Sequence, residues 1–179
     1  PLPFILQPRS KSCATPFCVV SLFPLARGAN TWYTLPGQQK RQEVRETMTA
    51  IICMDDKNGI LFNRRRQSQD RLLREDLLRE TGSSPLWMSG YTARQFSPQP
   101  ENVRITEDLA AVPEGYCFVE TQDPGTWATP PAGLIVYRWN RVYPADLFCT
   151  LPLEQWTLVR REEFAGSSHE KITKEVYTR

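Results

Sequence analysis

The sequence predicts one α/β domain, residues 48–179, built on a mixed β-sheet flanked by helices. Two apolar runs, residues 49–54 and 116–120, lack the polar alternation of a surface strand, which is typical of strands buried on both faces. An amphipathic helix lies between these runs, whereas three later strand-like runs have no helix of useful length between them. This order indicates helix-connected strands early in the domain and antiparallel pairing late in it.

Residues 1–47 differ from the rest of the chain in composition. They hold six of the fifteen prolines, and no strand or helix period persists in them. Three interpretations are open: a secretory signal, a disordered or docking tail, and a translated leader that is not part of the native protein. We favour the leader, because Met48 directly precedes the first strand and codons for residues 42–44 can contain a ribosome-binding sequence.

The main helix is predicted over residues 68–81. Leu73 and Leu77 stand four positions apart on its apolar face. Ser68 can cap its start and Gly82 can end it.

The other predicted elements are short. Asn58-Gly59 is a strong turn signal, and residues 64–66 form a basic run that is typical of a solvated loop. Further strands are predicted at 60–62, 86–89, 103–105, 134–140, 156–162 and 171–178, with a short helix at 91–96, a helical turn at 107–112 and a Pro- and Gly-rich loop at 122–133.

Composition limits the classes of function. The chain has 22 Lys and Arg against 20 Asp and Glu, so no general electrostatic attraction to nucleic acid or membrane is expected. No apolar run approaches the ~20 residues of a transmembrane helix. A single His argues against a zinc site that needs several imidazoles, and we predict no metal site. Cys53, Cys117 and Cys149 have no CxxC spacing, so we predict free thiols and a cytoplasmic location; the oligomeric state is left open.

Three stretches are similar to segments of dihydrofolate reductases. Residues 50–62 (AIICMDDKNGILF) resemble that family's first strand and its Asn-Gly-Ile turn, and residues 88–92 (MSGYT) resemble its Met-Gly-Arg-x-Thr segment. Residues 156–179 resemble its last two strands. The resemblance implies a trimmed dihydrofolate reductase-like fold, with a pterin substrate and NADPH as the ligands of the family.

The chain also resembles a family of small bacterial proteins that often carry a ribonuclease Z label. The shared segments are RRQSxD, YRWNRxYPxD and EFxGSSHEKITKEVY, here residues 65–70, 137–146 and 163–177. Ribonuclease Z enzymes bind two zinc ions through His and Asp, including an HxHxDH run. This chain has no such run, so we expect no two-metal hydrolysis.

Asp70 is the first candidate catalytic residue. The resemblance to the reductases implies that it is the carboxylate that holds the pterin ring, with Asp76 as a second choice. Asp70, Leu73 and Leu77 share one helix face, where a carboxylate needs a partner, a ligand or water. A simple role at the start of the helix is the alternative.

The cofactor side departs from the reductase pattern. Where that family has a Gly-Gly pair that lets its backbone approach the cofactor phosphates, this chain has Glu120 and Thr121. The family's phosphate-binding Arg is replaced by Gly90 or Tyr91. These departures argue against NADPH binding in the family's manner; the cofactor is left unknown, with NADPH as an open candidate.

His169 is the second candidate catalytic residue. It lies in the run Ser167-Ser168-His169-Glu170, which holds the parts of a nucleophilic triad. Neighbours in an extended strand point to opposite faces, so these residues cannot form a triad with one another, although Asp70 or Asp146 can approach in space. The candidate ligand-binding residues are Arg65, Arg66, Tyr91, Thr92, Arg138 and Trp139.

The sequence thus favours a small domain that binds a pterin- or nucleotide-like ligand and is not an active dihydrofolate reductase. The alternative is an NADPH-dependent reductase with altered cofactor contacts, in which Asp70 positions the substrate. A weaker alternative is an RNA-binding or nuclease role for residues 64–66 and His169. Whether the protein is an enzyme is left open, and neither nucleic acid nor a membrane is the expected partner.

Overall fold

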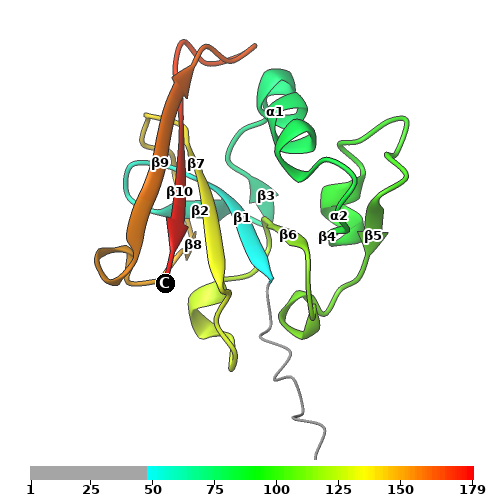
Figure 1. Cartoon of the computed structure of the whole chain (residues 1–179). Helices are drawn as coiled ribbons and strands as arrows, with labels where there is room; N and C mark the ends of the chain where they lie inside the picture. Colours follow the sequence, from blue (N-terminus) through cyan, green and yellow to red (C-terminus); the bar gives the residue numbers. More distant parts are fainter. Residues whose placement is uncertain (1–47) are drawn as a thin grey trace, which may run out of the picture. The chain divides into compact units, whose positions relative to one another are not determined.

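The computed structural model describes residues 48–179, and Figure 1 shows how their helices and strands are arranged. The larger sheet has seven strands in the order β5-β4-β6-β1-β7-β10-β9. These strands are β1 (Thr49–Met54), β4 (Leu86–Met88), β5 (Val103–Ile105), β6 (Tyr116–Val119), β7 (Gly133–Arg138), β9 (Thr157–Phe164) and β10 (Ile172–Thr178). The smaller sheet has the order β3-β2-β8, with β2 at Gly59–Phe62, β3 at Arg65–Arg66 and β8 at Leu147–Phe148. The expectations for residues 1–47 lie outside the described part of the chain.

Strand direction divides the larger sheet as predicted. The central strand β1 is parallel to β6 and β7, and β4 is parallel to β5 and β6. The last strands reverse, since β10 is antiparallel to β7 and to β9. Ala50 to Met54 in β1 are all buried, as expected for a strand covered on both faces. The predicted mixed sheet is confirmed.

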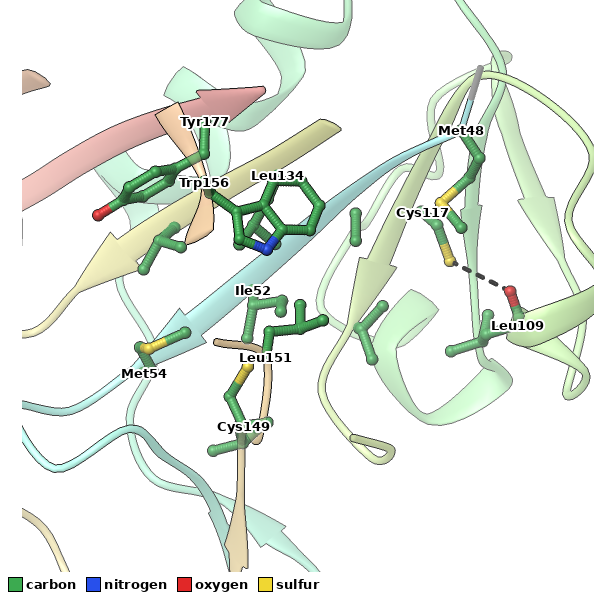
Figure 2. Packing of buried hydrophobic residues seen from close by; sticks show 14 of the residues in the cluster. Met48, Ile52, Met54, Leu109, Cys117, Leu134, Cys149, Leu151, Trp156 and Tyr177 are labelled. Atoms are coloured by element: carbon green, nitrogen blue, oxygen red, sulfur yellow. Dashed lines mark hydrogen bonds between the residues drawn. The ribbon is translucent and has the colours of Figure 1, made fainter. Parts of the chain in front are cut away.

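The two faces of the sheet are covered differently. The helices α1 (Arg71–Thr81) and α2 (Gly90–Ala93) contribute to one core, in which Leu73 and Leu77 pack with Ile51 and Phe118. The opposite core contains residues from the 3₁₀ turn η1 (Leu109–Ala111), from the smaller sheet and from the segment before β9. Figure 2 shows part of that second core, where Leu151, Trp156 and Cys149 lie near β1. Two further 3₁₀ turns are η2 (Pro124–Thr126) and η3 (Leu153–Gln155).

Several predicted boundaries were wrong. Helix α1 begins at Arg71, and Asp70 rather than Ser68 caps it by accepting the N–H groups of Leu72 and Leu73. The short helix predicted at 91–96 begins one residue earlier and ends earlier, as α2, and the helical turn predicted at 107–112 shortens to η1. The basic run is not all loop, because Arg65 and Arg66 form β3 and pair with β2. Strand β8 was not predicted.

The cysteines and the helices of residues 48–179 bear on two further sequence-based expectations. Cys53, Cys117 and Cys149 are free and buried. Burial raises the pKa of the Cys117 thiol to about 12 and that of Cys149 to about 11. Among the described helices none has the length and apolarity that a membrane span requires.

Candidate functional site

Most of the predicted site residues gather beyond the carboxyl ends of β6, β1 and β7. Open α/β sheets bind ligands at this edge, because the loops that leave parallel strands meet there. Two polar clusters occupy the edge in this chain. We call them the Glu120 cluster (Arg66, Tyr91, Thr92, Gln95, Glu120) and the His169 cluster (Ser68, Asp70, Trp139, Tyr143, Ser168, His169).

The Glu120 cluster centres on a buried ion pair. Glu120 directly follows β6 and is only 4% exposed; its Oε1 lies 3.2 Å from Nε of Arg66. Its Oε2 accepts a hydrogen bond from Gln95 Nε2 at 2.9 Å. Burial raises the pKa of Glu120, although Arg66 and the side chains of Thr92 and Gln95 oppose that rise. The Glu120 carboxyl group is therefore held in the protein interior by the side chains of Arg66, Thr92 and Gln95.

Arg66 joins this ion pair to the short helix α2. Its guanidinium lies 4.3 Å from the centre of the Tyr91 ring and donates to the Tyr91 carbonyl oxygen at 3.2 Å. The backbone N–H of Arg66 donates to the Tyr91 hydroxyl at 3.0 Å. Predicted ligand residues Arg66, Tyr91 and Thr92 are thus brought together, and the guanidinium is already engaged by protein groups.

The His169 cluster is held by Asp70. Besides capping α1, the Asp70 carboxylate accepts the N–H of Ser167 at 2.9 Å, the N–H of Ser168 at 2.7 Å and the Ser168 hydroxyl at 3.0 Å. Burial by itself raises the pKa of Asp70, but these hydrogen bonds outweigh it and hold the pKa well below its usual value. Asp70 is therefore an ionised anchor that ties the β9–β10 connection to the start of α1.

His169 lies between this anchor and three other side chains. Its Nδ1 is 3.3 Å from Asp70 Oδ2, and its ring stacks on Trp139 with centroids 4.5 Å apart and planes at 24°. On the other side of the ring, Nε2 is 3.2 Å from Ser68 Oγ and 3.1 Å from the Tyr143 hydroxyl. The carboxylate favours a proton on Nδ1, an assignment from the hydrogen-bond network that leaves Nε2 as an acceptor.

A surface hollow of about 320 Å³ touches both clusters. Arg66 connects it to the Glu120 cluster, and Tyr143 connects it to the His169 cluster. The amide oxygen of Gln67 is buried there without a hydrogen-bond partner in the described structure. The lining residues are Phe62, Asn63, Arg65, Arg66, Gln67, Tyr143 and Pro144.

Two of the predicted residues lie elsewhere. Arg138 extends from the end of β7 to Glu175 of β10, with Nε 2.7 Å from Glu175 Oε2. Asp76 accepts hydrogen bonds from the Tyr137 hydroxyl and from Lys174 Nζ, both at 2.8 Å. In residues 48–179 no group of three or more His, Cys, Asp or Glu side chains is placed to hold a metal ion.

The segment after β6 also carries a second buried carboxylate. Asp123 is 7% exposed and accepts the N–H groups of Gly125 and Thr150 at 2.8 and 3.0 Å. The turn that follows it, η2, has only three residues. The chain's own acidic groups thus occupy the end of β6 and the start of the next turn.

Comparison with solved structures decides the fold. The structure is similar to a dihydrofolate reductase from Enterococcus faecalis complexed with NADP(H) and RAB-propyl, with a TM-score of 0.53 and 14% sequence identity. The match covers 75% of this chain and 96% of that one. This chain has a dihydrofolate reductase-like fold. No protein-family model matches this chain, and no curated protein matches its sequence.

Sequence reasoning missed several residues of the candidate site. Phe62, Gln67 and Tyr143 line the hollow but were not selected, and Ser68 was considered only as a helix cap. Residues 65–70 and 137–146 are two of the segments shared with the small bacterial family. Their joint presence was the signal in the sequence that they lie close together. The distances between them depend on long-range strand pairing, which spacing alone does not give.

Proposed function

We propose that this protein binds a small planar ligand that carries an acidic group, pterin-like or nucleotide-like, in the hollow beside β3. One observation carries the proposal: the hollow combines the exposed cation of Arg65 with the aromatic rings of Phe62 and Tyr143. Phe62 is 48% exposed, so its ring offers a face for stacking. Arg65 is exposed and offers a bidentate donor to a carboxylate or phosphate.

The size of the hollow favours one ring system. At about 320 Å³ it lies at the lower end of the roughly 300–1,000 Å³ range of small-molecule sites. Ring stacking on Phe62 or Tyr143 and an acidic group that binds Arg65 together describe the proposed ligand class.

The alternative, an NADPH-dependent reductase, is less well supported. A dinucleotide needs backbone N–H groups and positive potential where its phosphates lie. At the end of β6 this chain has the buried carboxylates of Glu120 and Asp123 instead. We therefore propose that the fold has lost its use of NADPH and that the domain is not an active dihydrofolate reductase. An RNA-binding or nuclease role has less support still, because Arg66 is engaged by Glu120 and Tyr91.

Thermal unfolding of the full chain with folate, GMP, AMP and NADPH tests the proposal. A ligand present at about 100 times its Kd stabilises the native state by ~2.7 kcal/mol, so a true ligand gives a clear rise in Tm. We expect a rise with folate or a mononucleotide and none with NADPH at equal concentration. A rise with NADPH alone, or with none of the four, contradicts the proposal.

Two neighbouring arginines give a matched pair of variants. Arg65→Ala removes a cation from the lining and is expected to weaken binding roughly tenfold, since a charge-assisted hydrogen bond contributes about 1.5 kcal/mol. Arg64→Ala removes an equal charge just outside the lining and is expected to leave the affinity within about twofold. Equal losses of affinity in the two variants would mean that the overall positive charge of this segment, and not a contact inside the hollow, determines binding.

A further inference from the structure

The His169 cluster contains a serine, a histidine and an acid in series. Ser68 Oγ lies 3.2 Å from His169 Nε2, and His169 Nδ1 lies 3.3 Å from Asp70 Oδ2. The serine and the histidine are 101 positions apart in the sequence, so the fold and not the local chain creates this arrangement. A nucleophile within reach of a base, and a base oriented by a carboxylate, is the geometry that activates a hydroxyl group.

Asp70 is suited to orienting the ring. It is fixed by the N–H groups of Ser167 and Ser168 as well as by those of α1, so it stays ionised and cannot turn away. Trp139 covers the face of the ring and restricts its rotation. The histidine therefore presents Nε2 toward Ser68 in one orientation, which lowers the entropic cost of a reaction there.

We propose that Ser68, His169 and Asp70 form a catalytic triad for the hydrolysis of an ester bound at the adjoining hollow. Ser68 Oγ forms a bond to the ester carbonyl carbon while its proton passes to His169 Nε2. The C–O bond to the leaving alcohol then breaks, and the alcohol takes up that proton. Water attacks the acyl-serine with loss of a proton to Nε2, and this proton returns to Ser68 Oγ as the carboxylic acid leaves.

The chain around Ser68 links this triad to the hollow. Arg65, Arg66 and Gln67, which immediately precede the serine, all line the hollow. The exposed positive charge of Arg65 favours the oxyanion that develops on the carbonyl oxygen. The substrate class, an ester of a planar ligand with an acidic group, rests on the proposed function, whereas the reactivity of the triad does not.

Tyr143 is a second donor to the same nitrogen. Its hydroxyl lies 3.1 Å from Nε2, and one lone pair accepts one proton at a time. Tyr143 therefore competes with Ser68 for the base. Tyr143 also lines the hollow. A ligand that accepts a hydrogen bond from the tyrosine hydroxyl therefore leaves His169 Nε2 free to accept the Ser68 proton.

Labelling of the full chain with a fluorophosphonate probe tests the triad without any natural ligand. Attack of Ser68 on phosphorus expels fluoride and leaves a phosphonylated serine, which peptide mass mapping locates. We expect the label on Ser68, its loss in Ser68→Ala and at least a hundredfold slower labelling in His169→Gln. The control Ser83→Ala, at an exposed serine, should be labelled at the wild-type rate.

A further variant separates a catalytic role from a structural one. Tyr143→Phe removes the competing donor, so it is expected to label Ser68 several-fold faster than the wild type. Absence of label from the folded wild-type chain, labelling of another serine, or no acceleration in Tyr143→Phe would overturn the proposal. Because Ser68→Ala leaves the hollow's lining intact, ligand-induced stabilisation of that variant reports separately on the proposed function.

Discussion

At the scale of single residues, Asp70 performs two structural tasks. One oxygen caps α1 through Leu72 and Leu73, while the carboxylate as a whole also holds Ser167 and Ser168 in the β9–β10 connection. A pure helix cap contributes about 1 kcal/mol, and hydrogen bonds to a charged group contribute about 1.5–3 kcal/mol. The anchoring of the connection is therefore the larger contribution.

We expect Asp70→Asn to lower the free energy of unfolding by roughly 3 kcal/mol at pH 7, because an amide N–H₂ then faces the N–H and hydroxyl of Ser168. Urea unfolding measures the difference. Asp108→Asn is the matched control, since Asp108 precedes η1 without a side-chain cap bond and should change stability by less than about 0.5 kcal/mol. A small effect at both positions would contradict the anchoring role.

The low pKa of Asp70 predicts a pH dependence of known sign. Its pKa is lower in the folded protein than the ~3.9 of an unfolded chain, so its stabilisation is fully present above that value. The stabilisation is lost as the pH falls below about 4 toward the folded pKa. We expect the stability difference between wild type and Asp70→Asn to shrink over this acidic range. A constant difference from pH 7 to pH 3 would refute the assignment.

At the scale of elements, the close contact between the β9–β10 connection and α1 depends on Gly166. A Cβ at this position would lie 2.8 Å from Ile172 Cδ1 and would also meet Asp70 Oδ2. Gly166 N–H also donates to the His169 carbonyl oxygen at 2.9 Å, so the glycine lies inside the turn that positions the histidine. The connection cannot accept a side chain here without moving away from the helix.

We predict that Gly166→Ala destabilises the protein by about 1–3 kcal/mol, as overpacking typically does, and alters the fluorescence of Trp139 under the His169 ring. Thermal melting and emission spectra measure both changes. Gly90→Ala is the control, because its nearest neighbour is the flexible end of Glu107 at 3.2 Å. If Gly166→Ala and Gly90→Ala change the stability by the same amount, the close contact between the β9–β10 connection and α1 does not require a glycine.

The elements also show which features a sequence can predict. The presence of β1, β6 and α1 was predicted correctly, because the apolar runs of the two strands and the Leu73–Leu77 spacing of the helix indicate which residues are buried. The start of α1 was placed too early, because Ser68 and Asp70 are both good caps. The choice between them depends on Ser167 and Ser168, which approach from a distant segment.

At the scale of the whole molecule, the order of elements along the sequence predicts the fold. The candidate site depends instead on contacts between residues that are far apart in the sequence. Parallel strands joined through α1 and antiparallel strands at the end of the chain follow from connection lengths, which a sequence displays. The meeting of Asp70 with His169 spans 99 positions, and that of Tyr143 with His169 spans 26. Such contacts are set by the register of strands, which hydrophobic pattern alone does not fix.

The exposed edge of the large sheet is protected by charge. Within residues 48–179, strand β9 pairs only with β10, and its residues from Thr157 to Glu163 are all exposed. Its first half exposes Leu158 and Val159, and its second half carries ion pairs, in which Arg160 pairs with Glu80 and Arg161 with Glu175. Charged edge strands discourage further strand addition.

The location of the ligand is the central claim, and chemical-shift mapping of the full chain by NMR tests it most directly. GMP or folate, whichever raises the Tm, is titrated into ¹⁵N-labelled protein. We predict that the largest amide shifts occur at residues 62–67 and at Tyr143, with none at residues 122–126. Shifts centred on residues 120–126 would instead place the ligand at the end of β6, where a dinucleotide site was argued to be lost.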